Sequence, residues 1–123
     1  MLLDSSLSET DSGSSILRKN DLGDFDIGDN ELTSLEGSPK KVLGSFMAHK
    51  NEIHSLKGGP KEVGGSFIIL HNNITSLEFS PSLVKEDFIC SHNPLKELSG
   101  INTVLGYIFT GVYIPNIKCQ KYV

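Results

Sequence analysis

The sequence predicts a mainly β solenoid built from units of about 21 residues, and three sets of recurring residues support this prediction. Phenylalanine recurs at one constant interval, at Phe25, Phe46, Phe67, Phe88 and Phe109. Asparagine stands five residues after each of the first four, at Asn30, Asn51, Asn72 and Asn93. Leucine and proline fill two further columns, at Leu35, Leu56, Leu77 and Leu98 and at Pro39, Pro60 and Pro81. Matched columns at a period in the twenties are typical of a chain that coils, with each unit stacked on the next.

Length and composition are those of one small domain. The chain has 123 residues, 37% of them hydrophobic, and a formal net charge of −4. A single unit has too few apolar side chains to offset the entropy lost on ordering its backbone, so the units must stack to be stable. We expect no room for a separate enzymatic domain.

Residues 1–21 leave two readings open. Serine is abundant there, which is typical of a flexible lead-in. The same segment contains Ile16 and Leu17, which are suited to a strand that covers the open end of a solenoid. We therefore assign residues 1–21 to a flexible or capping segment.

Residues 22–106 form the four repeats. Each unit is expected to contain a short strand at its phenylalanine, with that ring and the residue two positions later facing inward. The asparagine follows where the chain must turn, and its buried side chain can bond the backbone of its own unit and of the next one. The proline-containing return segment is too short for a full helix, so we expect extended or 3-10 structure there.

The residues 46–56, Phe-Met-Ala-His-Lys-Asn-Glu-Ile-His-Ser-Leu, resemble the leucine-rich-repeat frame, in which apolar positions precede an asparagine and two more apolar positions. The repeat sequences over residues 22–109 resemble those of short bacterial leucine-rich-repeat arrays and of the arrays encoded by tailed bacteriophages. The resemblance implies a leucine-rich-repeat solenoid with a parallel β-sheet on its concave face and short extended or 3-10 segments on its convex face. The first apolar position departs from the frame, since Gly64 and Lys85 occupy it in later units.

Residues 107–123 are expected to form a C-terminal strand and cap. The stretch from Gly106 to Pro115 is rich in aromatic and β-branched residues, which suits an end strand. Pro115 and the lysines of residues 118–121 should end that strand and protect its edge.

The outward side chains of the strands form columns, because equivalent residues of successive units lie on neighbouring strands about 4.8 Å apart. These columns have an acidic end, an apolar middle and a fringe of histidines. The candidate partner-binding residues are Asp24, Asp26, Asp29, Met47, His49, Lys50, Ile68, Leu70, His71, Ile89, Ser91 and His92. An apolar patch with a polar fringe is typical of a protein-binding surface. The alternative is a short twisted sheet that carries some β-forming residues outward.

Other chemistries have little support in the sequence. His71 and His92 should stack, but His49 stands two positions away and no carboxylate is placed to orient them, so we expect no metal site and no cofactor. Ser91 beside His92 lacks an oxyanion site, so we expect no catalysis. Basic residues are not clustered, which disfavours nucleic acid, and no segment predicts a membrane span or a signal peptide. Cys90 lies in an apolar column, which is typical of a small buried residue.

The sequence therefore predicts a non-enzymatic protein-binding module that acts in the cytoplasm. The phage resemblance implies a host protein as partner, in the host cytoplasm, and an accessory role that inactivates a defence factor by occupying it. An alternative is a structural or assembly protein that forms a homo-oligomer or a virion part. A further alternative is an acidic mimic of nucleic acid, built on Asp24, Asp26 and Asp29.

Overall fold

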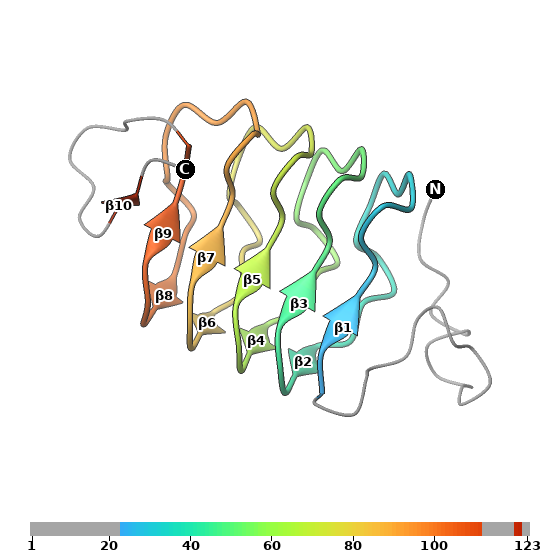
Figure 1. The fold of residues 1–123 in the computed structure, drawn as a ribbon, viewed down its shortest axis with the longest axis vertical. Coiled ribbons are helices and arrows are strands. Elements are labelled where there is room, and N and C mark those ends of the chain that lie inside the picture. The colour runs from blue at the N-terminus through green and yellow to red at the C-terminus, as the bar shows by residue number, and fades with distance from the viewer. Residues whose placement is uncertain (1–22, 112–119, 122–123) are drawn as a thin grey trace.

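The computed structural model describes residues 23–111 and 120–121, which coil into a parallel β-solenoid of about four units (Figure 1). The fold is mainly β, and neither an α-helix nor a 3-10 helix occurs in these ranges. Residues 1–21, which were predicted to be a flexible or capping segment, lie outside the described ranges, and so do Val112 to Cys119. We number the units from the first inward aromatic residue: unit 1 is residues 25–45, unit 2 is 46–66, unit 3 is 67–87 and unit 4 is 88–107.

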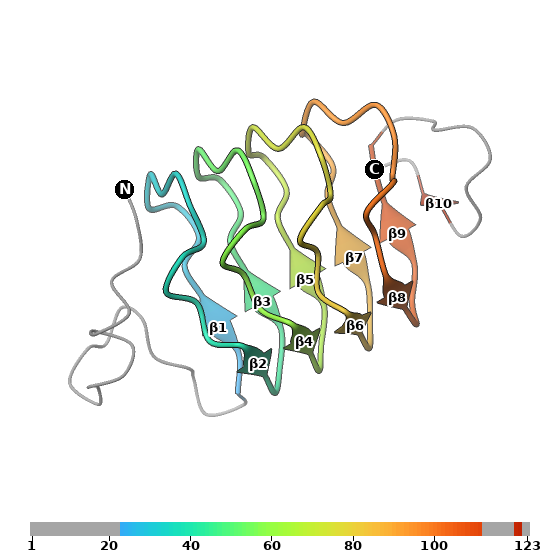
Figure 2. The same cartoon turned by 180° about the vertical axis from the view of Figure 1, so that it is seen from behind.

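Each unit contributes one strand to each of two parallel sheets, which lie on adjacent sides of the coil (Figures 1 and 2). Sheet A has the order β1 (Phe25–Asp26), β3 (Phe46–Met47), β5 (Phe67–Ile68), β7 (Phe88–Ile89), β9 (Ile108–Phe109) and β10 (Gln120–Lys121). Sheet B has the order β2 (Lys41–Val42), β4 (Glu62–Val63), β6 (Leu83–Val84) and β8 (Thr103–Val104). The return segment thus carries a second hydrogen-bonded sheet, where the sequence predicted only short extended or 3-10 pieces.

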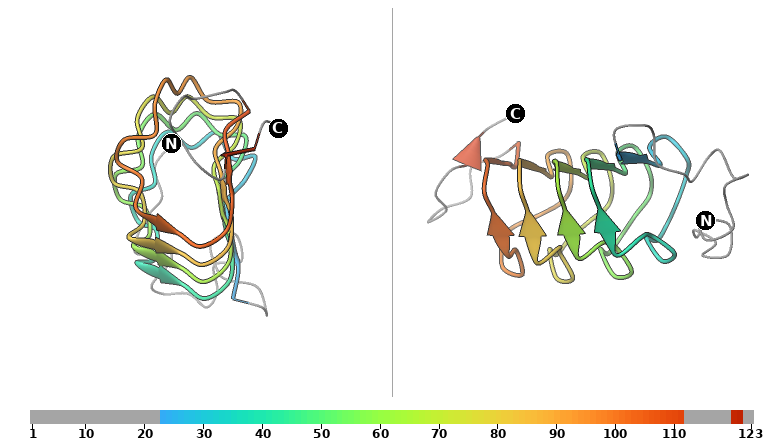
Figure 3. Two further views of the ribbon diagram at one scale, coloured as in Figure 1. Left: turned by 90° about the vertical axis from the view of Figure 1, so that its left-hand side faces the viewer. Right: turned by 90° about the horizontal axis from the view of Figure 1, so that it is seen from below.

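A column of aromatic rings fills the coil. The ring centroids of Phe25 and Phe46 are 5.6 Å apart, those of Phe46 and Phe67 5.4 Å, and those of Phe67 and Phe88 5.1 Å. The view along the coil axis shows the units superimposed around one common interior (Figure 3, left). The predicted stacking is confirmed for these four phenylalanines.

The prediction was wrong for the fifth phenylalanine, Phe109, which was expected to face inward. Phe88 pairs with Ile108, and Phe109 pairs with Ile89, so the step into β9 is one residue shorter than the others. Ile108 therefore takes the inward position and packs against the core. Phe109 lies in the outward column, and Thr110, the next residue, is buried.

The missing residue lies at the corner before sheet B. Units 1 to 3 place two residues there, Pro39-Lys40, Pro60-Lys61 and Pro81-Ser82. Unit 4 has only Asn102, since Ile101 still bonds in the common register while Thr103 already pairs with Leu83. The Asn102 amide nitrogen donates to the carbonyls of Ser80 and Pro81, 3.3 and 3.2 Å away. An asparagine thus replaces the corner proline where the corner is short.

Asparagines form a polar ladder beside sheet A, as the sequence predicted, but they bond the preceding unit where the next one was expected. The Asn72 Oδ1 accepts from the N–H of Ile53 in the preceding unit, and its Nδ2 donates to carbonyls of both units, including Ala48 and Ile69. Asn51 and Asn93 make the equivalent bonds. Asn30 differs, because it is exposed and its Nδ2 donates to Gly28 of its own turn. Each asparagine of the ladder therefore completes the unit before it.

A second polar ladder runs along the corner that leads into sheet A. Asp24 Oδ1 accepts from the N–H of Ser45, Ser45 Oγ from Ser66, and Ser66 Oγ from Asp87. Asp87 Oδ1 then accepts from the N–H of Tyr107. Each of these side chains serves the unit after it, in the opposite direction from the asparagines.

After the last unit, β10 lies parallel to β9, with Gln120 opposite Ile108 and Lys121 opposite Phe109. Residues 118–121 were predicted to end the final strand and protect its edge. Residues 120–121 instead extend sheet A by one strand. The edge of β9 is therefore covered by backbone pairing.

Candidate functional site

The outward face of sheet A carries a continuous apolar row. We call Met47, Ile68, Ile89 and Phe109 the outer row; they stand opposite one another on β3, β5, β7 and β9. Each follows an inward residue of its strand, so alternation places it on the outer side. All four are half-buried, because neighbours about 4.8 Å away cover their sides. The predicted patch is thus brought together by the fold, with Phe109 as an addition that the sequence analysis missed.

A second outward column, two residues further along each unit, contains Gly28, His49, Leu70 and Ser91 and contributes less than expected. His49 and Leu70 are half-buried and lie beside the outer row. The His49 imidazole lies over Gly28, where an added Cβ would come within 2.4 Å of the ring, so a glycine is required for this placement. Ser91 was predicted to face a partner, but it is 5% exposed, and we remove it from the candidate surface.

The third column stands where each strand leaves the sheet. Asp29, Lys50, His71 and His92 are all exposed, with φ angles between 56° and 60°. This left-handed conformation, adopted at the turn before each asparagine, is uncommon for residues other than Gly, although Asn, Asp and His adopt it more often than the rest. It brings the His71 and His92 rings face to face, 4.1 Å apart and 3° from parallel. The predicted stacking of these two histidines is confirmed.

The acidic residues at one end of the columns differ in their exposure. Asp26 and Asp29 are exposed at the end of the columns, and Glu31, which the sequence analysis did not select, is exposed next to them. Asp24 is half-buried and accepts a hydrogen bond from the Ser45 backbone, which gives it a structural role. The signal for this role was present in the sequence as the column of short polar residues Asp24, Ser45, Ser66 and Asp87.

The described residues contain no group of three or more His, Cys, Asp or Glu side chains that could hold a metal ion. The stacked histidines are also poorly arranged for chelation, since the lone pairs of parallel rings lie in parallel planes and do not converge on one ion. The Cys90 thiol is fully buried, and burial raises its pKa to about 12. A thiol with such a pKa stays protonated near neutrality and is a poor nucleophile.

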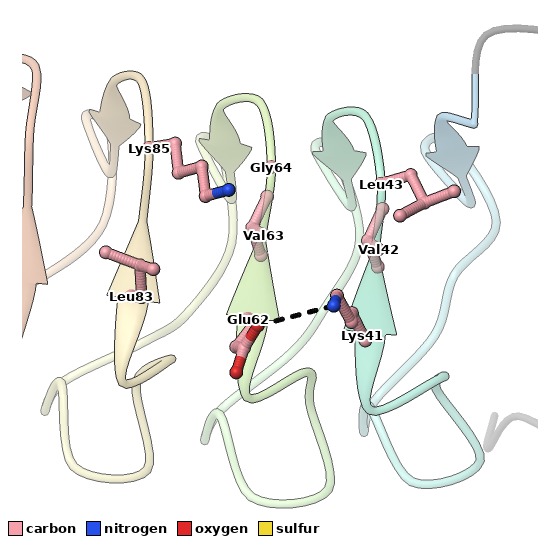
Figure 4. A pocket seen from close by; sticks show the side chains of 8 residues that line it. All are labelled: Lys41, Val42, Leu43, Glu62, Val63, Gly64, Leu83 and Lys85. Carbon is pink, nitrogen blue, oxygen red and sulfur yellow. Dashed lines mark ion pairs between the residues drawn. The ribbon is translucent and has the colours of Figure 1, made fainter.

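A shallow depression lies on sheet B, over Gly64 and between Leu43 and Lys85 (Figure 4). Its volume is about 140 Å³, below the several hundred Å³ typical of small-molecule sites. Lys41 and Glu62 form an exposed ion pair at its rim, 3.9 Å apart. Gly64 has a packing reason to be glycine, because a Cβ there would lie 2.2 Å from the Leu43 carbonyl oxygen. The depression therefore follows from the absence of a side chain at Gly64, which the close packing of neighbouring units requires.

Comparison with known proteins found no match to this chain among protein-family models, curated proteins or solved structures. The described part of the chain also contains no helix that is long and apolar enough to cross a membrane. The fold defines this chain as a parallel β-solenoid repeat protein. Its units repeat at the interval that separates Phe46 from Phe67, which pair on neighbouring strands.

Proposed function

We propose that this chain is a non-enzymatic binding module that docks a partner protein on the outer face of sheet A. The observation that carries the proposal is the outer row, an apolar strip across four neighbouring strands that the core does not need. Its inward neighbours, such as Phe67 and Ile69, already fill the coil and are fully buried. An apolar centre bordered by charged and histidine side chains fits the anatomy of a protein interface.

The proposal includes a family and a setting. We propose a leucine-rich-repeat type of bacterial or bacteriophage origin, with sheet A as its concave face, acting in a host cytoplasm on a host defence factor. The repeated strand and asparagine support the repeat type, and the second parallel sheet departs from it. The phage setting rests on resemblance alone.

The test is affinity capture from the native host with the partner identified by mass spectrometry, comparing three proteins. Ile68→Asp places a charge in the middle of the outer row, and we expect it to lower capture at least about tenfold while the fold is retained. Leu43→Asp is the matched control, because Leu43 is 65% exposed and lies next to sheet B. Equal capture by the wild type and Ile68→Asp would place the interface elsewhere.

The assembly alternative predicts a closed oligomer of this chain. Sedimentation velocity over a wide range of protein concentration separates the two proposals. A concentration-independent monomer that still captures a partner supports the docking proposal.

A further inference from the structure

The spacing of the outer row, taken with the acidic end of sheet A, defines the shape and charge of an occupant. From them we infer that the partner element is an amphipathic α-helix of about three turns with basic residues at one end. This inference rests on the proposed docking function and adds to it the chemical class of the partner.

The row sets a repeat that the partner must follow. Neighbouring strands lie about 4.8 Å apart, so the four side chains of the outer row span about 14 Å. A helix lying along the row presents one side chain per turn at a pitch of about 5.4 Å, and an inclination of about 27° reduces that repeat to about 4.8 Å. About eleven or twelve helical residues then cover the whole row, with apolar contacts near positions i, i+3 or i+4, i+7 and i+10 or i+11.

An extended segment fits this row less well. Side chains on one face of a strand repeat every ~6.6 to 6.8 Å, so the mismatch with the row reaches about 5 to 6 Å over three steps. Inclining the strand by about 45° removes the mismatch but carries its ends off the row. The row therefore favours a helical occupant over an extended one.

The charge pattern gives the occupant a polarity along the row. Asp26 stands directly before Met47 in the same column, and Asp29 and Glu31 follow it in the same unit and are exposed. None of these three carboxylates forms an ion pair among the described residues. Phe109, at the other end of the outer row, has the ring of Tyr107 beside it at 6.5 Å, edge to face. On β10, Lys121 follows Phe109 in the same register, so the acidic residues are confined to the Asp26 end. A helix with Lys or Arg at the end over Asp26 and an apolar stripe along the row matches this polarity.

The experiment is a display selection against the intact chain with two libraries of equal size. One library carries randomised residues on one face of an Ala/Glu/Lys helix of about four turns, and the other carries alternating randomised positions in an extended peptide long enough to cross the row. We expect the helix library to be enriched, with apolar residues at one helical face and Lys or Arg at one end. Binding of the enriched peptides should fall at least about tenfold with Ile68→Asp and stay unchanged with Leu43→Asp.

The charge component is tested separately with the double variant Asp26→Lys, Asp29→Lys. It should weaken the enriched peptides about tenfold in low salt, with a smaller difference at about 0.5 M salt. A preference of this double variant for peptides with acidic ends would support the assignment further. Enriched peptides without a basic end, or no response to the double variant, would overturn it.

Other outcomes separate this inference from the docking function. Enrichment of extended peptides that still depend on Ile68 would overturn the helical partner and keep the docking face. Peptides that bind the wild type and Ile68→Asp equally would reject both. If neither library is enriched, the helical partner is overturned, and the capture experiment alone decides the docking function. Circular dichroism and thermal melting of each variant confirm that it is folded.

Discussion

Unit 3 and unit 4 follow the same path, but they differ in how strictly they keep the repeat. Unit 3 keeps the full interval, has a ring neighbour on each side of Phe67, and has a buried asparagine at Asn72. Unit 4 reaches the next equivalent position one residue sooner, and the residue stacked on Phe88 there is Ile108. Its asparagine, Asn93, is only half-buried. The comparison teaches that the inward column and the second polar ladder, through Asp87 and Tyr107, tolerate a shorter corner, provided that each strand keeps its pairing.

The largest expected effect is on the aromatic column. Phe67→Ala should lower the free energy of unfolding by about 3–5 kcal/mol, since it opens a cavity in a fully packed core. Phe88→Ala should cost about 1 kcal/mol less, because Phe88 has one ring neighbour and Phe67 has two. Urea denaturation of the two variants measures the difference. An equal or larger loss for Phe88→Ala would show that Ile108 replaces a ring without loss.

The asparagine ladder gives the next largest effect. Asn72→Ala should cost roughly 2–4 kcal/mol, because it leaves buried groups such as the Ile53 N–H without a partner. Asn93→Ala should cost roughly half of that, since water can reach the groups it leaves. Asn72→Asp is the matched control that keeps the acceptor and loses the donors. If both alanine variants lose the same stability, the backbone groups that Asn72 and Asn93 bond are equally shielded from water.

A smaller effect, of opposite sign, is expected at Phe79. This residue has a φ of 70° and is 51% exposed, whereas Gly37, Gly58 and Gly100 hold the equivalent left-handed position in the other units. Phe79→Gly should raise the free energy of unfolding by about 1 kcal/mol, because glycine adopts this conformation without strain. Phe79→Ala keeps the Cβ and should bring no gain. A loss of stability in Phe79→Gly would show that the ring packs favourably against its own unit.

The smallest effect separates Cys90 of unit 4 from Ile69, which holds the same inward position in unit 3. Burial raises the pKa of Cys90 from its ordinary 9.0 to about 12, so the folded state holds this proton more tightly than the unfolded state. Its contribution is therefore fully present below pH 9 and is lost as the pH rises from 9 to 12. At pH 9.5 the wild type should lose about 0.8 kcal/mol more than Cys90→Ala. Parallel stability curves for the two proteins between pH 8 and 10 would contradict this.

Much of the fold could be predicted because its constraints act at fixed positions of a constant period. Phe46, Phe67 and Phe88 must stack if units of equal length coil, and Asn51 and Asn72 must serve the backbone that the turns leave unpaired. The stacking of His71 and His92 follows from the same geometry. Such positions are repeated in the sequence because the physical requirement is repeated in each unit.

The errors came where two repeated signals disagreed. Phe109 keeps the phenylalanine interval by coincidence, whereas the run Val104-Leu105-Gly106 repeats Val42-Leu43-Gly44 and gives the observed register. Leu105 is 66% exposed, like Leu43 at 65%, which confirms this alignment. A strict period hid the one-residue deletion at Asn102, although the loss of the corner proline marked it.

The candidate site was predicted only in outline, because outward positions carry no repeated requirement. Met47, Ile68 and Ile89 could be placed from alternation alone. The burial of Ser91 and the backbone bond of Asp24 depend on local packing that a column of residue types does not reveal. The second sheet was missed because strands of two residues leave too short a pattern to detect.

The two polar ladders also determine how this array can change in length. Asparagines such as Asn72 serve the backbone of the preceding unit, and Ser45 and Ser66 serve that of the following one. Removing or duplicating one whole unit inside the array joins groups of the same kind and leaves no N–H without its acceptor. A cut of any other length breaks both sets of bonds at once. Gene duplication and unequal recombination can therefore lengthen or shorten such a protein in whole modules, and with it the number of side chains offered to a partner.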